Sequence, residues 1–328
     1  MDSYDIFGLD HPCMDLNVNL DRIPERNSGV RTNDLSFQGG GKVSSGMVAA
    51  ARLGARCTLG GVLGDDIFGR FCYQDFLRHG INVDNMKLRD GCDTGLSIVI
   101  SEKDTQTRSF LFRTGQAKPL SWEEVDWSYL KNSKYLFIAD ASPLTRNAVA
   151  LARENGVKIF IDADYYSDAL YEMIPQIDYF VGSEFVFDRI FPGSKRKGLE
   201  NLEQECAKLM AMGPEAVVFT FGERGCVGLD QKGFFHLPAF QVEVRDTVGA
   251  GDVFHGAFLA ALLKGYDLKN CARYASGTSA IKCTRPGGRA GIPNENVLQR
   301  FLETGFIDYT EIDQRVEYYR KGLEYVSG

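Results

Sequence analysis

The chain has 328 residues, of which 44% are hydrophobic, and this is enough for a large core. Its formal net charge is −7. Its 37 basic residues form no concentrated cluster beside 44 acidic ones, which argues against nucleic acid as a partner. No apolar run could span a membrane and no signal peptide is recognisable, so we expect a cytoplasmic protein. The eight cysteines include no C-x-x-C pair, and we expect them to be reduced thiols.

The N-terminal third is predicted to hold two strand–helix units and a separate group of extended segments. Apolar spacing that ends at a glycine predicts helices over 42–55 and 66–80, and strands are expected at 4–10 and 56–64. Two further segments, about 15–38 and 95–114, look extended and rich in β-branched and aromatic residues. They are predicted to form a small β-sheet.

From Tyr135 onward, apolar strands alternate with helices. This alternation predicts a mostly parallel sheet that is covered by helices on both faces. No internal repeat or linker divides the chain, so we expect one domain over residues 1–328. The predicted strands are 134–140, 157–164, 177–184 and 216–225, and the predicted helices lie near 144–155, 167–174, 199–213 and after Asp252.

A glycine loop, Gly249-Ala250-Gly251, stands directly before Asp252 and an apolar helix. A helix N-terminus gathers unpaired N–H groups and the positive end of the macrodipole, so it favours an anion. Because the loop has no bulky side chain, a ligand oxygen can approach its amides closely. The alternative is an ordinary strand-to-helix turn in which Asp252 only caps the helix.

A second glycine cluster opens the helix that starts near Lys42. It is no P-loop, because Ser36 stands where that motif needs glycine and Val43 follows the lysine. Three successive glycines before a lysine indicate backbone that approaches a polar ligand.

These two clusters, "GGKVSSGMVAAARLGA" with "GVLGDDIFG" and "RDTVGAGDVFHGAFLAALL", together with "VVFTFGERG" and "RPGGRAGIP", occur in the order typical of one family. The chain resembles the PfkB, or ribokinase-like, carbohydrate kinases over nearly its whole length. The resemblance implies a three-layer αβα sandwich with a mostly parallel central sheet and a small β lid. It also implies ATP and Mg²⁺ as cofactors, and transfer of a phosphoryl group to a hydroxymethyl group of a sugar-like molecule.

The resemblance assigns catalytic roles to the glycine loop before Asp252. Asp252 corresponds to the general base, and Gly249, Ala250 and Gly251 correspond to the anion hole for the transferring phosphoryl group. This agrees with the chemistry, because phosphoryl transfer mainly needs positioning and charge neutralisation.

On the acceptor side, the resemblance implies that Asp15 binds sugar hydroxyls, and the setting of Asp15 is similar to the opening of adenosine kinases. The alternative is a loop aspartate that caps its neighbours. Arg113 is a candidate for an anionic group on the substrate, although strand-edge arginines are more often solvated. The remaining expected substrate-binding residues are Gly40, Gly41, Lys42 and Ser45, where Ser45 replaces the usual Asn.

On the nucleotide side, Thr220, Gly222 and Gly225 match the turn beside the ATP phosphates. Ser183 and Glu184 fall in the region that acts on Mg²⁺ through water, although the usual Asn is replaced. Asp246 and Thr247, with carbonyls of 285–291, resemble a monovalent-cation loop for an ion such as K⁺.

Three hypotheses remain open from the sequence. The first is an ATP-dependent sugar kinase whose lid closes over the substrate, and edge-to-edge pairing of two lids would give a homodimer. The second is a nucleoside kinase of the same family. The third is a ligand-binding protein without catalysis, for which the replacements at Ser45 and Ser183 leave room.

Overall fold

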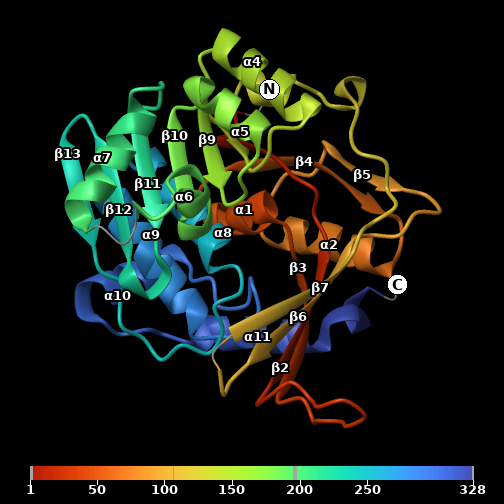
Figure 1. Cartoon of the computed structure of the whole chain (residues 1–328). Helices are drawn as coiled ribbons and strands as arrows, with labels where there is room; N and C mark the ends of the chain where they lie inside the picture. Colours follow the sequence, from red (N-terminus) through yellow and green to blue (C-terminus); the bar gives the residue numbers. More distant parts are fainter. Residues whose placement is uncertain (1–2, 106, 195–197, 327–328) are drawn as a thin grey trace.

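The computed structural model describes residues 3–105, 107–194 and 198–326. Within them, a nine-stranded sheet forms the centre of the molecule (Figure 1). Its strands are β1 (Ile6–Leu9), β4 (Cys57–Gly64), β5 (Met86–Arg89), β8 (Tyr135–Ile138), β9 (Lys158–Ala163), β10 (Tyr179–Ser183), β11 (Ala216–Thr220), β12 (Cys226–Asp230) and β13 (Gly233–Leu237).

The strand order is β13-β12-β11-β10-β9-β8-β1-β4-β5, and only the pairs β11–β12 and β12–β13 are antiparallel. From β1 the chain builds the sheet in one direction through β4 and β5, and then returns to add β8 on the other side of β1. The order therefore reverses between β1 and β8, and such a reversal is where open α/β sheets bind ligands, outside the carboxyl ends of the strands.

Helices cover both faces of this sheet, as the alternation of strands and helices predicts. Successive residues of one strand point to opposite faces, so that Phe160 joins one core cluster while Ile159 and Ile161 join the other. The first cluster is covered by α1 (Lys42–Arg52), α2 (Ile67–Arg78), α8 (Ala250–Leu263), α9 (Leu268–Cys283), α10 (Glu295–Thr304) and α11 (Thr310–Lys321). The second is covered by α3 (Ser128–Lys131), α4 (Pro143–Glu154), α5 (Asp168–Met173), α6 (Glu184–Ile190) and α7 (Leu199–Met210).

Short 3₁₀ turns complete the helical elements. They are η1 (Trp122–Glu124), η2 (Ile174–Gln176), η4 (Gly222–Arg224) and η5 (Gly322–Tyr325).

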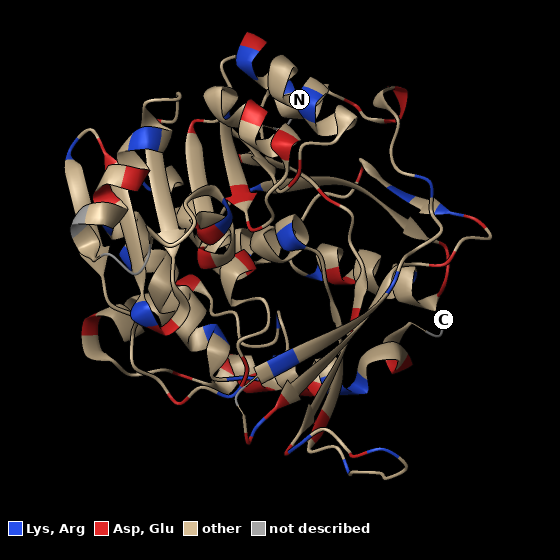
Figure 2. Ribbon diagram, viewed as in Figure 1, with Lys and Arg blue, Asp and Glu red and all other residues tan. Residues whose placement is uncertain are grey.

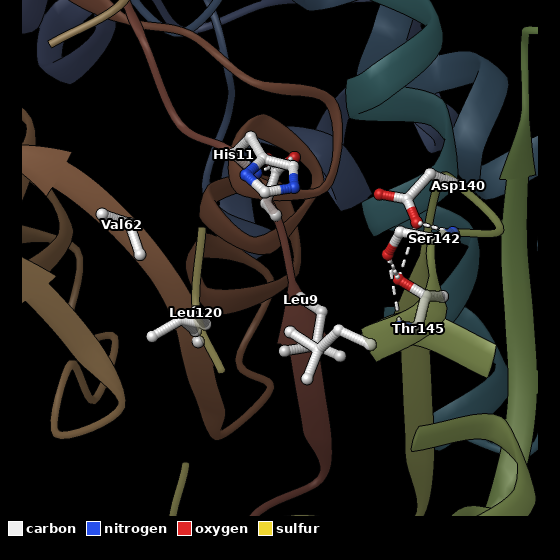
Figure 3. A pocket seen from close by; sticks show the side chains of 10 residues that line it. Leu9, His11, Val62, Leu120, Asp140, Ser142 and Thr145 are labelled. Carbon is white, nitrogen blue, oxygen red and sulfur yellow. Dashed lines mark hydrogen bonds between the residues drawn. The ribbon is translucent and has the colours of Figure 1, made fainter. Parts of the chain in front are cut away.

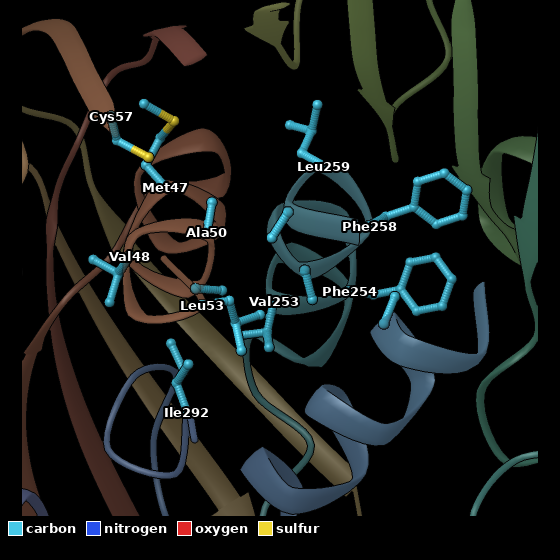
Figure 4. Packing of buried hydrophobic residues seen from close by; sticks show 14 of the residues in the cluster. Met47, Val48, Ala50, Leu53, Cys57, Val253, Phe254, Phe258, Leu259 and Ile292 are labelled. Carbon is cyan, nitrogen blue, oxygen red and sulfur yellow. The ribbon is translucent and has the colours of Figure 1, made fainter. Parts of the chain in front are cut away.

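The helices α1 and α8 pack closely because both carry glycine at their crossing. A Cβ atom on Gly256 would lie 1.8 Å from the carbonyl oxygen of Gly46, so only glycine permits this approach. Around the crossing, Leu53, directly after α1, and Val253 of α8 point toward one another in the shared core (Figure 4). This packing fixes the N-terminal ends of the two helices, which follow the two glycine clusters, relative to each other.

A second sheet projects from the first, at the lower right of Figure 1. It consists of β2 (Met14–Leu20), β3 (Asp34–Gly39), β6 (Leu96–Glu102) and β7 (Thr107–Arg113), in the order β3-β2-β6-β7. The pairs β2–β3 and β6–β7 are antiparallel, whereas β2 and β6 run parallel. The predicted fold class, a mostly parallel sheet between helices with a small second sheet, is confirmed.

Acidic and basic residues are interspersed over the elements seen in Figure 2. In the part of the chain that the structure describes, no helix has both the length and the apolar character that a membrane crossing requires.

Candidate active site

The N-terminus of α8 carries the predicted anion-binding residues. Gly249 precedes the helix with φ 70°, and a Cβ atom there would lie 2.9 Å from Cα of Gly288, so this position requires glycine. The helix begins at Ala250, two residues earlier than a loop over 249–251 implies. The amide of Ala250 donates to the carbonyl of Thr247 at 3.2 Å, whereas a Cβ on Gly251 would face open space. An anion can therefore approach the first turn of α8 at Gly251.

Asp252 lies in this first turn and is partly exposed. Burial among protein atoms and the negative charge of Asp162 raise the pKa of Asp252 to about 8, against the opposing effect of Lys42. A carboxyl with a raised pKa is, once ionised, a stronger proton acceptor than an ordinary carboxylate.

Lys42, the first residue of α1, connects the two glycine clusters. Its ammonium lies 2.7 Å from a carboxylate oxygen of Asp164, just past the end of β9. Burial alone would lower the pKa of Lys42, but the charges of Asp162, Asp164 and Asp252 outweigh it and raise that pKa. The structure thus places the Lys42 ammonium among the carboxylates beside Asp252, rather than with Asp15.

His255 faces the same carboxylates from the second turn of α8. Its Nδ1 atom lies 3.0 Å from Oδ2 of Asp162, in a contact not aligned as a hydrogen bond, and both side chains are buried. Burial opposes protonation of His255, but Asp162 outweighs it and raises the pKa of the imidazole. The charge of Asp162 thus acts on both His255 and Asp252.

Asp15 lies against the glycine cluster before α1. A Cβ atom on Gly40 would lie 2.4 Å from Oδ1 of Asp15, so the carboxylate rests directly on the glycine backbone. Burial raises the pKa of Asp15 to about 6, although Arg289 acts in the opposite direction. Gly41 has φ 101° and lies against Asp10, whose carboxylate accepts a hydrogen bond from the Ser44 amide at 2.6 Å. Asp10 therefore caps the start of α1 from another segment.

A buried arginine holds the acceptor-side loop from behind. Arg289 has no exposed surface, pairs with Asp75 at 2.8 Å, and donates to the carbonyl of Gly40 at 3.0 Å. It also donates to the hydroxyl of Ser45 at 3.4 Å, so Ser45 is engaged within the protein. Arg113 is largely exposed and pairs with Asp93, an ion pair that would have to open before Arg113 could bind a substrate.

The predicted nucleotide-side residues come together at the carboxyl ends of β10 and β11. Ser183 and Thr220 are register partners in these parallel strands. Glu184 pairs with Arg224, inside the turn that Gly222 and Gly225 form. A Cβ on Gly225, at φ 85°, would lie 1.9 Å from the carbonyl oxygen of Leu237, so this turn also requires glycine.

A small pocket lies at the reversal of strand order between β1 and β8 (Figure 3). Asp140, Ser142 and Thr145 line one side and Val62 and Leu120 the other, with His11 and Leu9 between them. The oxygens of Asp140 and Ser142 accept from the start of α4. The pocket borders the Asp10 turn, but the charged groups around Asp252 are not part of its lining.

Comparison with known proteins decides the family. The family model for the pfkB family of carbohydrate kinases matches residues 5–295. The chain belongs to this family. It is 27% identical to a 5-dehydro-2-deoxygluconokinase of Halalkalibacterium halodurans, with 92% of this chain and 95% of that protein covered. It is 26% identical to a nucleoside kinase of Methanothermobacter thermautotrophicus, with 90% and 95% covered.

Solved structures agree on the fold. The structure of Arabidopsis thaliana ribokinase complexed with ribose and ATP superimposes with a TM-score of 0.77 at 20% identity, over 92% of this chain and 99% of that one. The protein described here is thus an ATP-dependent carbohydrate kinase with a ribokinase-like fold.

At the predicted cation loop of this kinase, one backbone carbonyl is bound by an ammonium of the protein. The carboxylate of Asp246 accepts hydrogen bonds from the amides of Val248 and Gly287, at 3.0 and 2.9 Å. The carbonyl of the same residue accepts from the ammonium of Lys282 at 2.9 Å. Thr247 accepts a hydrogen bond from Arg108 of β7, which ties the second sheet to the segment before α8.

Several charged residues of the kinase site are not identified by sequence patterns. Asp162 and Asp164 give one available signal, since two carboxylates end a buried strand at the edge where parallel sheets bind ligands. No comparable signal marks the others, because their roles depend on contacts between distant segments. These residues are Asp10, Arg289 and Lys282.

Proposed function

We propose that this kinase transfers the γ-phosphoryl group of ATP to a hydroxymethyl group of a sugar or sugar-like molecule, with Asp252 as the general base. Asp252 accepts the hydroxyl proton, the alkoxide oxygen bonds to the γ-phosphorus, and the bond to the β-phosphate oxygen breaks to release ADP. The observation that carries this proposal is the position of Asp252, in the first turn of α8 and beside Lys42.

Gly249, Ala250 and Gly251 are proposed to form the anion hole. The amide of Gly251 and the positive end of α8 stabilise negative charge on the transferring group, while the turn bond from Ala250 to Thr247 keeps this end rigid. The ammonium of Lys42 adds a fixed positive charge next to the same space, and its pairing with Asp164 sets its orientation.

ATP is proposed to lie over the carboxyl ends of β10 and β11, along Thr220, Gly222 and Gly225. Ser183 and Glu184 are proposed to act through water on the Mg²⁺ that the phosphates carry. The hydroxyl of Ser183 supports this arrangement, because it is buried and lies close enough to Asp164 to lower the pKa of that carboxyl.

The acceptor is proposed to lie between Asp15, Gly40 and Gly41, with its reacting hydroxyl toward Asp252. The second sheet is proposed to act as a lid that closes over the acceptor and excludes water, which would otherwise compete as acceptor. Arg108 and Ser101 support this role, because they already connect the sheet to Thr247 and Asp246 beside α8.

A nucleoside is the second candidate acceptor. It is supported by the similarity to the nucleoside kinase of M. thermautotrophicus and by the segment around Asp15. Binding without catalysis is the least supported function, since the glycine loop and Asp252 are both intact.

A homodimer through the lid is also proposed. β7 is the edge strand of the lid, all its residues are exposed, and Phe110, Leu111 and Phe112 present apolar side chains there. An exposed apolar edge strand favours pairing with a second copy. Sedimentation should give a dimer for the wild-type protein and a monomer for Phe112→Ser, and a wild-type monomer at micromolar concentration would contradict the proposal.

The test of the chemistry is ADP release with ATP, Mg²⁺ and a panel of sugars, sugar acids and nucleosides. We expect one class to be used at least tenfold better than the others, as differences of this size follow from one or two pocket contacts. Asp252→Asn should lower kcat about 10²- to 10⁴-fold with nucleotide binding retained. The matched control is Glu303→Gln, an exposed carboxylate on α10. Wild-type kcat in Asp252→Asn would disprove the role of the base.

A further inference from the structure

Lys282 places a completely buried ammonium beside the anion-binding end of α8. Its side chain in α9 has no exposed surface, and its Nζ atom donates to the backbone carbonyl of Asp246 at 2.9 Å. It forms no ion pair with a carboxylate of residues 3–105, 107–194 or 198–326. A buried charge is costly unless polar groups compensate it, and here a carbonyl dipole takes the part that a carboxylate usually takes.

The carbonyl that Lys282 binds belongs to the segment that sets the anion hole. Asp246 is held against the segment 285–291 by the amide of Gly287, and Gly288 of that segment touches Gly249. The amides of Arg245 and Asp246 both donate to the carbonyl of Cys283, directly after Lys282. The ammonium therefore lies where the segment before α8, the segment 285–291 and the end of α9 meet.

This arrangement does not fit a diffusible monovalent cation. K⁺ is bound by carbonyl oxygens, and an ammonium is a cation of similar size that takes the same oxygens as ligands. The Lys282 ammonium and a K⁺ ion at the same carbonyl would repel each other strongly, because no water screens charges in this buried position. The backbone carbonyl of Asp246 is thus already bound by a cation of the chain itself.

We propose that the Lys282 ammonium is the permanent cation of this site, so that phosphoryl transfer by this kinase needs no added monovalent cation. Lys282 acts as a positioning residue, because it touches neither ATP nor acceptor and works through Asp246. Its fixed charge holds the turn that leads to Gly249. It also holds the lid contact that the carboxylate of Asp246 makes with Ser101, at 3.1 Å. The effect on kcat rests on the proposed function, whereas the effect of cations on the melting temperature does not.

The first test uses the wild-type protein in buffers free of K⁺, Na⁺ and NH₄⁺. Choline chloride keeps the ionic strength constant while KCl replaces it stepwise, and both the melting temperature and kcat are measured. We expect neither quantity to depend on K⁺, with kcat changing less than about twofold. A rise of kcat or melting temperature that saturates with K⁺ and is absent with choline would overturn the proposal.

Variants of Lys282 test the role of its charge. Lys282→Met keeps most of the volume and removes the charge, so kcat should fall roughly ten- to hundredfold, with a smaller change in the KM values, because the anion hole loses its alignment. Lys282→Ala removes the side chain and leaves room for an ion. K⁺ or NH₄⁺ should then raise its melting temperature and recover part of kcat, whereas choline should not.

The matched control is Lys269→Met, which removes an exposed lysine from the same helix and should behave as wild type. Full kcat in Lys282→Met would overturn the positioning role. If the variants do not fold, the cation dependence of the wild-type protein alone decides the question. If no acceptor is phosphorylated, the melting temperatures still decide whether a cation binds, so failure of the proposed function is distinguished from failure of this inference.

Discussion

Asp252 can accept a proton only when it is ionised, and its surroundings oppose ionisation. Its pKa is raised to about 8 by burial and by Asp162. Activity is therefore lost as pH falls through this raised value. We expect kcat/KM, which reports the free enzyme, to have an acid limb well above the ordinary carboxyl range. A pH–rate profile measures this, and an acid limb near pH 4 would contradict the raised pKa.

The ionised carboxylate of Asp15 is predicted to lower the free energy of unfolding, although it is proposed to bind the acceptor. Its pKa is raised to about 6 in the folded protein, so the folded state binds the proton more tightly than the unfolded state. Ionised Asp15 is then unfavourable above pH 6, and this penalty disappears as pH falls from about 6 toward 4. Asp15→Asn should raise the free energy of unfolding at pH 8 by about 1–3 kcal/mol.

Urea unfolding at pH 8 and pH 4 tests this prediction for Asp15, with a smaller gain expected at pH 4. The acceptor KM of Asp15→Asn should rise, because the carboxylate on Gly40 is lost. A gain in the free energy of unfolding of Asp15→Asn over wild type that is smaller at pH 8 than at pH 4 would refute this prediction.

Residues whose role follows from local sequence can be predicted at this scale. Glycines before a helix act through their own backbone, and an aspartate in the first turn places its carboxylate beside that backbone, so Gly249 and Asp252 are recognisable as candidates. Lys42 is recognisable as a site residue, but its partner is not, because Asp164 approaches only when β9 and α1 pack together. Arg289 and Lys282 are ordinary in sequence and become unusual only through complete burial.

At the scale of elements, α11 lies outside the residues matched by the family model and is still linked to the glycine cluster before α1, where we propose the acceptor to bind. The hydroxyl of its Tyr319 donates to one oxygen of Asp75 at 2.8 Å, and the other oxygen of Asp75 pairs with Arg289. Arg289 in turn holds the carbonyl of Gly40. Helix α11 thus supports the glycine cluster before α1 through the buried side chains of Asp75 and Arg289.

Tyr319→Phe should weaken this support. The change leaves one oxygen of the buried Asp75 without its hydroxyl donor, so the free energy of unfolding should fall by about 1–3 kcal/mol. The acceptor KM should rise while the ATP KM stays near the wild-type value. Tyr325→Phe, which alters an exposed tyrosine near the end of the chain, is the control. Equal acceptor KM values in both variants would show that α11 does not reach the site.

The elements themselves are largely predictable, because apolar periodicity and terminal glycines mark α1, α2, α7 and the buried strands. The start of α8 differs, since Ala250 and Gly251 are already helical where the glycines indicate a loop. α11 has no predictable function, because a polar, tyrosine-rich helix looks like a surface appendage until Tyr319 is seen to be buried.

At the scale of the whole molecule, the sheet and its helix layers follow from the order of strands and helices along the chain. The order of strands within the sheet does not, since β1 lies between β4 and β8 only because the chain reverses direction there. The parallel pairing of β2 with β6 also has no local signal, because the two strands belong to separate insertions.

This parallel pair has a consequence for the order of folding. β2–β3 and β6–β7 are each continuous pieces of chain, but Asp15 meets Ser97 only after β4, α2 and β5 have taken their places between them. Closing so long a loop costs entropy before any contact compensates it, which makes such pairings late events. In pulsed hydrogen exchange during refolding, amides of β2 should therefore gain protection after those of β4. Newly synthesised molecules would then pass through a stage in which the central sheet has formed but the second sheet does not yet cover the proposed acceptor site.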